Sequence, residues 1–364
     1  MEILMLDDFE ATEVKPKRAR SWIAALVSIA IVGGGLTAGY FAFRDAFEGG
    51  VGALISRFSV EDYDGNPGPP VVIVIEDGDT GEDVARKLVE ADVIKSFDAI
   101  YRDMLNVELT IYPGHFEFPT QIPGLEALQI LLAAENRVVV QVTIPEGLQL
   151  VEIVSVLVTD LGLSEERLLE AIEVANAERP GETLEGWLFP ASYTFDPGVD
   201  EQTVISTMLA RMDAELEGHG VGVDEGYEYL TLASIIQLEG RAEEDMYKIS
   251  TVFNNRLDRN IALQSDPTVK YYYEGSIESF QEGLADTANP YNTYVYPGLP
   301  PGPISSPGAA AIDAAINPVA GDWLYFVAIN LATGETVFSE TLVEHERAAE
   351  LYRQWLRENP GWDD

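Results

Sequence analysis

A glutamate at the end of an apolar helical stripe is the residue of this sequence best placed for acid–base chemistry. Three apolar residues and this glutamate fall at i, i+3, i+4 and i+7 of one helix face: Leu232, Ile235, Ile236 and Glu239. A carboxyl in that position loses hydration, which raises its pKa and suits a general acid near neutral pH. Gly240 follows and is expected to end the helix or open it toward a cleft. The competing interpretation is a helix-end glutamate that pairs with Arg241 or Arg256.

A second group of candidate residues lies in two segments that contain proline. Its members are amide, carboxylate and aromatic side chains: Gln264, Asp266, Tyr291, Asn292 and Tyr294. Such groups supply hydrogen bonds to sugar hydroxyls and flat apolar faces for stacking, so they are candidates for binding a glycan. The alternative is that Asp266 and Asn292 only stabilise turns.

Composition and charge exclude several classes of protein. The 364 residues include 62 acidic and 22 basic side chains, which gives a formal net charge of −40. So negative a surface repels phosphate backbones and anionic lipid, and nucleic acid is therefore not an expected partner. The absence of cysteine excludes disulfides, thiolate nucleophiles and Cys-ligated zinc. The three histidines are far apart in sequence, and neither a metal nor a cofactor is expected.

The N-terminal segment predicts a membrane anchor. Residues 22–43, WIAALVSIAIVGGGLTAGYFAF, carry no charge, and about 20 apolar residues suffice to cross a bilayer as a helix. Lys15, Lys17, Arg18 and Arg20 precede the stretch, whereas Arg44 alone follows closely. The positive-inside rule therefore predicts a cytoplasmic tail at 1–21 and an extracytoplasmic remainder, in the plasma or inner membrane. A cleaved signal peptide is the alternative.

The order of the strands and helices that must position these residues predicts an α+β fold. Residues 44–70 are rich in Gly and Pro and indicate a linker. A β-branched strand, a turn and an amphipathic helix then occur twice, at 71–94 and 138–163. Small units of this type recur in glycan-binding modules of the LysM kind, so residues 71–178 are predicted to be a LysM-like substrate-binding region. Two ordinary βα units are the alternative.

The later part of the chain predicts a mixed α/β catalytic domain over residues 179–358. A helical stretch extends from about Glu225 to Arg259, and the segment 289–308 has too many prolines for a helix. Long ordered loops of that kind often carry function. An amphipathic helix is predicted at the C-terminal end.

Several uncommon strings occur in a family-specific order. They are EGWLFPASYTF (185–195), LASIIQLEG (232–240), VFNNRL (252–257), LQSDPTV (263–269), YNTY (291–294) and GLPPGPISSPG (298–308). Together they resemble the YceG-like, or MltG, family of membrane-anchored endolytic murein transglycosylases. The resemblance covers nearly all of residues 70–358 and agrees with the single membrane helix predicted above.

This resemblance implies a catalytic glutamate and a reaction. Family members tend to carry an E-x-E pair in the helix with the LASI motif, and the second acid, here Glu239, is the catalytic one. The first position is Gln237 and the position after the acid is Gly240, and both depart from the family pattern. The implied reaction cleaves the β-1,4 bond between N-acetylmuramic acid and N-acetylglucosamine within glycan strands. Glu239 would protonate the bridging oxygen and then accept the proton of the muramyl C6 hydroxyl, which leaves a 1,6-anhydro end.

Three other functions stay open at this point. A hydrolase would need a second carboxylate opposite Glu239, and Asp266 is the candidate. A non-catalytic peptidoglycan-binding scaffold of the cell-wall synthesis machinery would use the βα units alone. A membrane-tethered adaptor for the cell-wall synthases is compatible with catalysis, because the anchor keeps the domain near nascent glycan.

Overall fold

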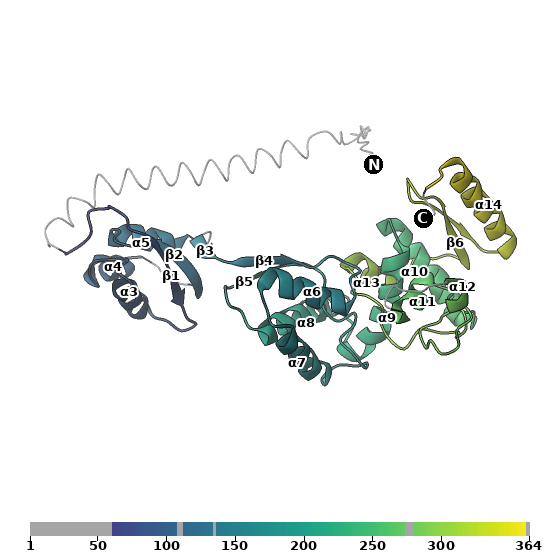
Figure 1. Cartoon of the computed structure of the whole chain (residues 1–364), viewed down its shortest axis with the longest axis horizontal. Helices are drawn as coiled ribbons and strands as arrows, with labels where there is room; N and C mark the ends of the chain where they lie inside the picture. The colour runs from purple at the N-terminus through teal and green to yellow at the C-terminus, as the bar shows by residue number, and fades with distance from the viewer. Residues whose placement is uncertain (1–59, 108–111, 134–135, 274–279, 362–364) are drawn as a thin grey trace, which may run out of the picture. The chain divides into compact units, whose positions relative to one another are not determined.

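The computed structural model describes residues 60–107, 112–133, 136–273 and 280–361 (Figure 1). The predicted cytoplasmic tail, the predicted membrane helix at 22–43 and most of the predicted linker lie outside these residues. Within the described part, no helix combines the length and apolar character needed to cross a membrane. The described residues form helices and small sheets, which confirms the α+β fold at this level.

The chain divides into two compact units. The smaller contains residues 79–111 and 118–132 with the described residues before 74, and the larger contains residues 74–78, 112–117 and those from 133 onward. The second strand–turn–helix unit, at 138–163, therefore belongs to the larger unit, and the LysM-like region at 71–178, which stays a prediction, includes residues of both units. The strand of that second unit is hydrogen-bonded to residues 192–195.

The described residues of the smaller unit contain three helices. They are α3 (Gly81–Glu90), α4 (Asp98–Met104) and α5 (Gly124–Leu132). Helix α3 begins with a reciprocal cap, in which the Thr80 hydroxyl accepts from the Asp83 N–H and the Asp83 carboxylate accepts from the Thr80 N–H. Val84 and Leu88 of α3 are fully buried, as the helical spacing predicts.

A three-stranded sheet has the order β1-β2-β3. Its strands are β1 (Pro70–Ile75), β2 (Gly114–Pro119) and β3 (Arg137–Val138). In β1 the buried Ile73 and Ile75 alternate with the exposed Val72 and Val74, which is the two-residue period of a strand with one buried face. The strand predicted at the start of the first βα unit is therefore confirmed.

The first part of the larger unit packs three helices beside a two-stranded sheet. Strand β4 (Val140–Thr143) pairs antiparallel with β5 (Ser192–Phe195), and the helices are α6 (Leu150–Leu161), α7 (Glu165–Asn176) and α8 (Glu201–Gly218). Helix α6 packs on β4, and α7 packs on α8. The fully buried Trp187, from the EGWLFP string, belongs to this core.

The second part of the larger unit is a cluster of helices around α9. Its elements are α9 (Val223–Glu239), α10 (Glu243–Asp258), α11 (Asp266–Tyr272), α12 (Phe280–Gly283) and α13 (Ala309–Ile316). Helix α9 packs against α10, α11 and α13, which lie together in Figure 1. The helical stretch predicted over about 225–259 ends its first helix at Gly240, as expected, because Gly240 caps α9 in an extended conformation and Ala242 is the N-cap of α10.

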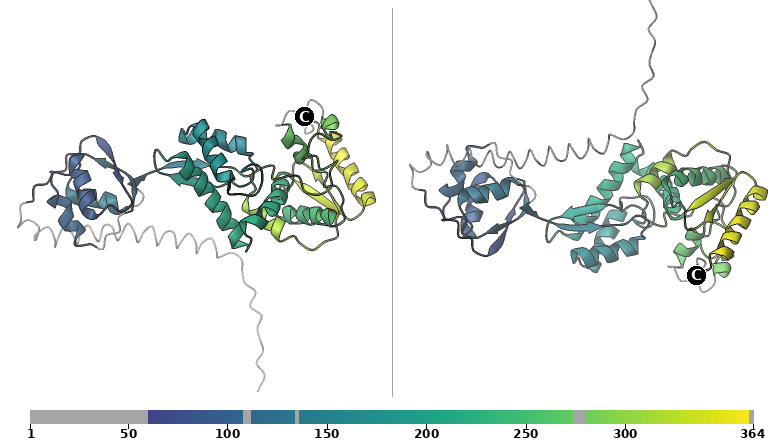
Figure 2. Two further views of the ribbon diagram at one scale, coloured as in Figure 1. Left: turned by 90° about the horizontal axis from the view of Figure 1, so that it is seen from below. Right: turned by 90° about the horizontal axis from the view of Figure 1, so that it is seen from above.

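A hairpin and a final helix complete the larger unit. Strands β6 (Tyr325–Asn330) and β7 (Glu335–Ser339) pair antiparallel, and α14 (Leu342–Glu358) packs on both, as the yellow segment of Figure 2 shows. Helix α10 also contacts β6. The predicted amphipathic C-terminal helix is therefore confirmed as α14.

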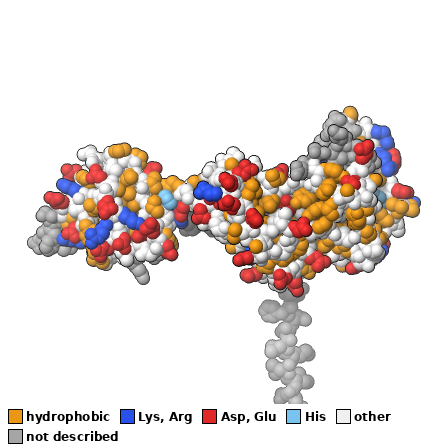
Figure 3. All heavy atoms as spheres, turned by 60° about the horizontal axis from the view of Figure 1, so that its bottom comes forward, with side chains coloured by type: hydrophobic (Ala, Val, Ile, Leu, Met, Phe, Trp, Pro, Cys, Tyr) orange, Lys and Arg blue, Asp and Glu red, His pale blue; other side chains and the backbone are white. Residues whose placement is uncertain are grey.

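On the face drawn in Figure 3, acidic side chains are scattered and do not form one patch.

Candidate active site

Glu239 is the last residue of α9, and the helix places it at the edge of the buried core. The three apolar residues of its stripe are at most 4% exposed, whereas Glu239 itself keeps partial exposure. The helix ends here because the N–H of Gly240 bonds to the carbonyl of Ile236 and the chain then leaves in an extended conformation. A side chain at position 240 would meet Met246 at 2.6 Å, so a residue without one suits this close turn.

The Glu239 carboxyl receives one hydroxyl hydrogen bond and lies in a desolvated environment. The Ser265 hydroxyl donates to Glu239 Oε1 at 2.7 Å. Burial raises the pKa of Glu239, and the Ser265 hydrogen bond opposes that rise. Asp266 raises this pKa further, while Lys270 and Arg256 lower it. A carboxyl that is desolvated yet partly exposed can hold its proton and present it to a ligand.

Ser265 is fixed by a network of buried hydroxyls. It is the N-cap residue of α11, but its side chain makes no capping hydrogen bond and is directed to Glu239 instead. Its backbone N–H donates to the Thr293 hydroxyl at 3.0 Å, and its carbonyl accepts from the Thr268 hydroxyl at 2.7 Å. The two threonine hydroxyls are 2.8 Å apart. The loop that contains residue 293 therefore holds Ser265 in place beside the acid.

Neither arginine proposed as an ion-pair partner of Glu239 has that role. Arg241 donates to the carbonyl of Leu331 at 2.7 Å. Arg256 is buried and donates to the carbonyls of Leu324 and Leu263. A helix-end glutamate that serves only an ion pair is therefore not what the structure contains.

Gln264 and Asp266 flank Ser265. Gln264 is exposed and has a left-handed backbone (φ 55°), which its N–H supports by donating to the carbonyl of Thr293 at 3.0 Å. Asp266 is partly exposed and accepts a hydrogen bond from the Tyr294 hydroxyl at 2.5 Å. The structure thus gathers Glu239, Gln264, Asp266 and Tyr294 around Ser265, as a shared site requires.

Asn292 is buried in its loop, and Tyr291 packs in an aromatic cluster. The Asn292 side chain is fully buried, and its amide donates to the carbonyls of Gly283, Leu284 and Asp286. The structure therefore does not support a direct glycan contact for Asn292, and the alternative of a turn-stabilising residue fits. Tyr291 packs against Tyr271 with ring centroids 4.8 Å apart, in an aromatic cluster and not at the Glu239 carboxyl.

Gln237, which departs from the family pattern, faces away from the acid. Its amide nitrogen donates to Glu146 Oε2 at 3.2 Å, and its amide oxygen accepts from the N–H of Gly308 at 2.9 Å. A glutamine can donate and accept at once, whereas a glutamate here would place a second carboxylate against Glu146. Gln237 therefore links α13 to the loop after β4, and the departure leaves the surroundings of Glu239 intact.

A second buried carboxyl, Glu185, was missed by the sequence analysis. It is 5% exposed and accepts hydrogen bonds from the backbone N–H of Leu150, at 3.0 and 3.1 Å, and from the Tyr271 hydroxyl at 3.3 Å. Burial raises its pKa to about 7. Its place inside the EGWLFP string was the only available signal, because no period or charge pattern marks it as buried.

Ser265 was also missed as part of the site, and Arg256 was considered only as an ion-pair partner of Glu239. Both lie in strings that were singled out, LQSDPTV and VFNNRL. A serine before Asp-Pro is typical of a helix N-cap, so the sequence favoured a local role for Ser265. What directs its hydroxyl to Glu239 is the packing of α11 on α9, which local sequence does not encode.

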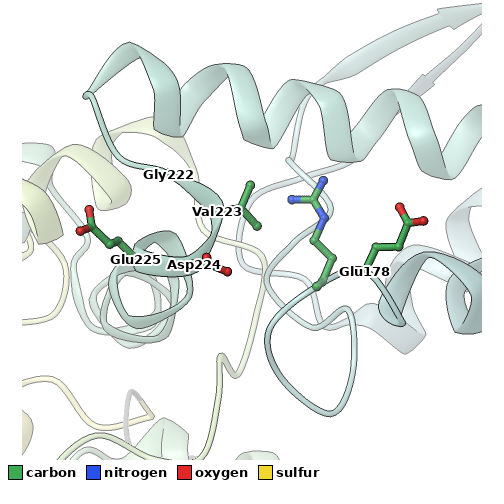
Figure 4. Close-up of a pocket in the computed structure, with 6 residues that line it drawn as sticks. Glu178, Gly222, Val223, Asp224 and Glu225 are labelled. Carbon is green, nitrogen blue, oxygen red and sulfur yellow. The ribbon is translucent and has the colours of Figure 1, made fainter.

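A pocket of about 610 Å³ lies at the other end of α9. Figure 4 shows it between residues that follow α7 and the first turn of α9, lined by Glu178, Asp224 and Glu225 among others. It is about 20 Å along the helix from Glu239.

Among the residues that the structure describes, no cluster of three or more His, Asp or Glu side chains could hold a metal ion.

Comparison with known proteins identifies the family. The sequence profile of the YceG-like family matches residues 73–351. The endolytic murein transglycosylase of Bacillus subtilis is 30% identical, and the match covers 78% of this chain and 84% of that protein. The protein of the same name from Streptococcus pneumoniae strain D39 is 28% identical, and the match covers 89% of this chain and 64% of that protein.

A solved structure agrees with this assignment. The structure of a yceG-like protein from Listeria monocytogenes is 29% identical, with a TM-score of 0.50, and the match covers 77% of this chain and 99% of that one. The family profile spans well over half of the sequence. The chain belongs to the YceG-like family.

Proposed function

We propose that this protein is an endolytic murein transglycosylase, as its relatives are named. It cleaves the β-1,4 bond between N-acetylmuramic acid and N-acetylglucosamine within peptidoglycan strands and leaves 1,6-anhydro ends. The observation that carries the proposal is the Glu239 carboxyl, which is desolvated at the end of α9, partly exposed and hydrogen-bonded by Ser265. The curated relatives and the family profile support the same reaction.

The reaction needs one carboxyl in two successive roles. Protonated Glu239 donates its proton to the bridging oxygen while the bond from that oxygen to the muramyl C1 breaks. The C6 hydroxyl of the same muramyl residue attacks C1, and its proton passes to the Glu239 carboxylate. The acid is thereby regenerated, and no water is consumed. In the carboxylate stage the Ser265 hydrogen bond stabilises the charge.

Asp266 favours a second candidate reaction, hydrolysis. Its negative charge is felt at Glu239, where it raises the pKa of the acid, and a second carboxylate is what water activation requires. The Tyr294 hydroxyl occupies one oxygen of Asp266. We propose instead that Asp266, with Gln264 and Tyr294, orients the glycan beside the acid. Tyr291 contributes from the aromatic cluster further along the loop.

Residues 71–178, which include most of the described smaller unit, are proposed to be a LysM-like glycan-binding region. It contains a pocket of about 620 Å³ between the start of α3 and the end of α4. The lining combines polar and aromatic groups, including Asp79, Thr80 and Tyr101, which is the mixture that sugars require. A second contact on the same glycan would strengthen binding through local concentration alone.

The membrane anchor is also a proposal. It depends on the uncharged sequence at 22–43 and on the basic residues before it. The anchor would leave the two units outside the cytoplasm, close to nascent glycan. Membrane-bound cell-wall synthases are then the partners that we expect to lie nearby.

The masses of the products test the proposed reaction. We expect purified protein to release fragments with 1,6-anhydro ends from intact peptidoglycan. Such ends are one water lighter than hydrolysed ends. Reducing ends without the anhydro bridge would favour hydrolysis with Asp266 as the base. Bound but uncleaved glycan would favour the non-catalytic scaffold.

A further inference from the structure

Arg256 of α10 is a buried cation whose hydrogen-bond partners are neutral. It is 7% exposed. Its guanidinium donates to the carbonyls of Leu324 at 2.6 Å, Leu263 at 2.7 Å and Ala262 at 3.2 Å, and to Gln264 Oε1 at 3.4 Å. Burying a charge against neutral acceptors is costly, so a buried arginine in such a place calls for a reason beyond packing.

The partners of Arg256 come from two segments far apart in the sequence. Three of them belong to residues 262–264, which lead directly into Ser265. The fourth is the carbonyl of Leu324, just before β6, and the guanidinium also lies over the ring of Tyr325 at 5.2 Å. The planar fork of an arginine can hold both segments at once, which a lysine ammonium cannot do with the same geometry.

We propose that Arg256 is a positioning residue of the active site, which holds residues 262–264 against the start of β6 and so places the Ser265 hydroxyl on Glu239. This inference rests on the proposed role of Glu239 as the acid. It also makes the β6–β7 hairpin a structural part of the catalytic apparatus, although the hairpin supplies none of the candidate glycan-binding residues.

The backbone of the held segment shows why it needs support. Gln264 adopts a left-handed φ of 55°, a conformation that costs energy for a residue with a side chain. The carbonyls of Ala262 and Leu263 are fixed by Arg256 on one side, and the N–H of Gln264 is fixed by the Thr293 carbonyl on the other. Ser265 follows directly, so a shift in this segment moves its hydroxyl.

Arg256 also acts on Glu239 through its charge. Its positive charge lowers the pKa of Glu239, as does that of Lys270, whereas Asp266 raises it. Burial lowers the pKa of Arg256, whereas Tyr325, Tyr294 and Glu239 favour its charged form. Burial and the charge of Arg256 both lower the pKa of His345 of α14. Removing the charge should therefore raise the pKa of Glu239, and removing only the fork should raise it less, through the displaced Ser265 hydrogen bond.

Two substitutions separate the two effects. R256K keeps the charge and loses the fork, and R256Q loses both. We expect kcat to fall about tenfold in R256K, with a small move of the basic limb of the pH–rate profile to higher pH, because the displaced Ser265 hydroxyl no longer lowers the pKa of Glu239. In R256Q we expect a larger fall in kcat and a larger move of the basic limb to higher pH, because the positive charge is lost as well. R241Q is the matched control, because Arg241 donates to a backbone carbonyl but is exposed, and it should leave both quantities unchanged.

Thermal unfolding of each variant, measured beside its kinetics, separates positioning from folding. The inference would be overturned if kcat per folded molecule and the basic limb were unchanged in both Arg256 variants. If R256Q does not fold, the decrease in kcat of folded R256K decides. Failure of the proposed function looks different, because then wild-type protein gives no anhydro ends or E239Q keeps its activity.

Discussion

Glu239 and Glu185 are two desolvated glutamates of the same unit, and they differ in what surrounds them. Burial raises the pKa of both. Glu239 is partly exposed and its hydrogen-bond donor is a serine hydroxyl, whereas Glu185 is 5% exposed and is held by the N–H of Leu150 at the start of α6. A raised pKa alone therefore does not identify a catalytic acid. The acid must also be able to contact substrate.

The surroundings of Glu185 indicate a structural role. It joins the first turn of α6 to Tyr271 of α11, and it lies beside the aromatic pair of Tyr271 and Tyr291. No element of the proposed reaction requires it. Perturbed carboxyls occur in structural networks as well as in active sites; Glu185 fits the first kind, and Glu239 is the candidate for the second.

The largest expected contrast is in catalysis. E239Q removes the proton donor and should lower kcat about 10²- to 10⁴-fold without loss of the fold. E185Q, which keeps an acceptor for Leu150, should retain turnover within about a factor of three. Release of soluble fragments from peptidoglycan measures both. Equal losses in the two variants would remove the distinction between them.

The next contrast concerns the pH dependence of the free energy of unfolding. The folded pKa of Glu185 is about 7 against an ordinary value of 4.5, so the folded state holds this proton more tightly. The contribution of this proton to the free energy of unfolding is fully present below the ordinary pKa, and it is lost as the pH rises through about 7. Between pH 5 and pH 8 the loss should be about 2 to 3 kcal/mol.

E185Q should lack this loss, because its side chain does not ionise. Urea unfolding of wild type and E185Q at both pH values measures the difference. A constant gap between the two proteins would show that Glu185 does not titrate in the folded state within this range.

A smaller decrease in kcat is expected when Ser265, the hydrogen-bond donor to Glu239, loses its hydroxyl. S265A removes the hydrogen bond that stabilises the Glu239 carboxylate, and kcat should fall about tenfold, or about 1.4 kcal/mol. Because that bond lowers the pKa of Glu239, the basic limb should move to higher pH. S265T, which keeps a hydroxyl, is the control that should recover part of the rate.

The smallest effect, on the free energy of unfolding, is expected when Tyr271, the hydroxyl donor to Glu185, loses its hydroxyl. Y271F removes a hydroxyl hydrogen bond of 3.3 Å, and its length indicates a weak interaction. The free energy of unfolding should fall by about 0.5 to 1 kcal/mol, with kcat unchanged. A loss of activity as large as that of S265A would mean that the two carboxyls work together.

The sequence predicted the acid but not the difference between the two glutamates. The apolar stripe of α9 and the break at Gly240 follow from local periodicity, so Glu239 was identified correctly as a helix-end carboxyl at the core. Glu185 lies in an irregular segment, where no period reports burial. Its environment arises from α6 and α11, which are distant in the sequence.

The two proline-containing segments that carry Gln264 and Asn292 show a similar limit of prediction from sequence. Residue types favoured sugar binding for Gln264 and Asn292 alike, yet one side chain is exposed and the other is fully buried against three carbonyls. Which side of a loop faces inward depends on tertiary packing. The family strings indicated that both segments matter, but not how each residue contributes.

The most direct test is the pH dependence of kcat/KM for wild type and E185Q on the same peptidoglycan. We expect activity to fall as the pH rises through an apparent pKa above the ordinary value of a glutamate, because burial keeps Glu239 protonated. E185Q should show the same basic limb. A limb that disappears in E185Q, or a wild-type limb at the ordinary pKa of glutamate, would contradict the assignment of Glu239 as the desolvated catalytic acid.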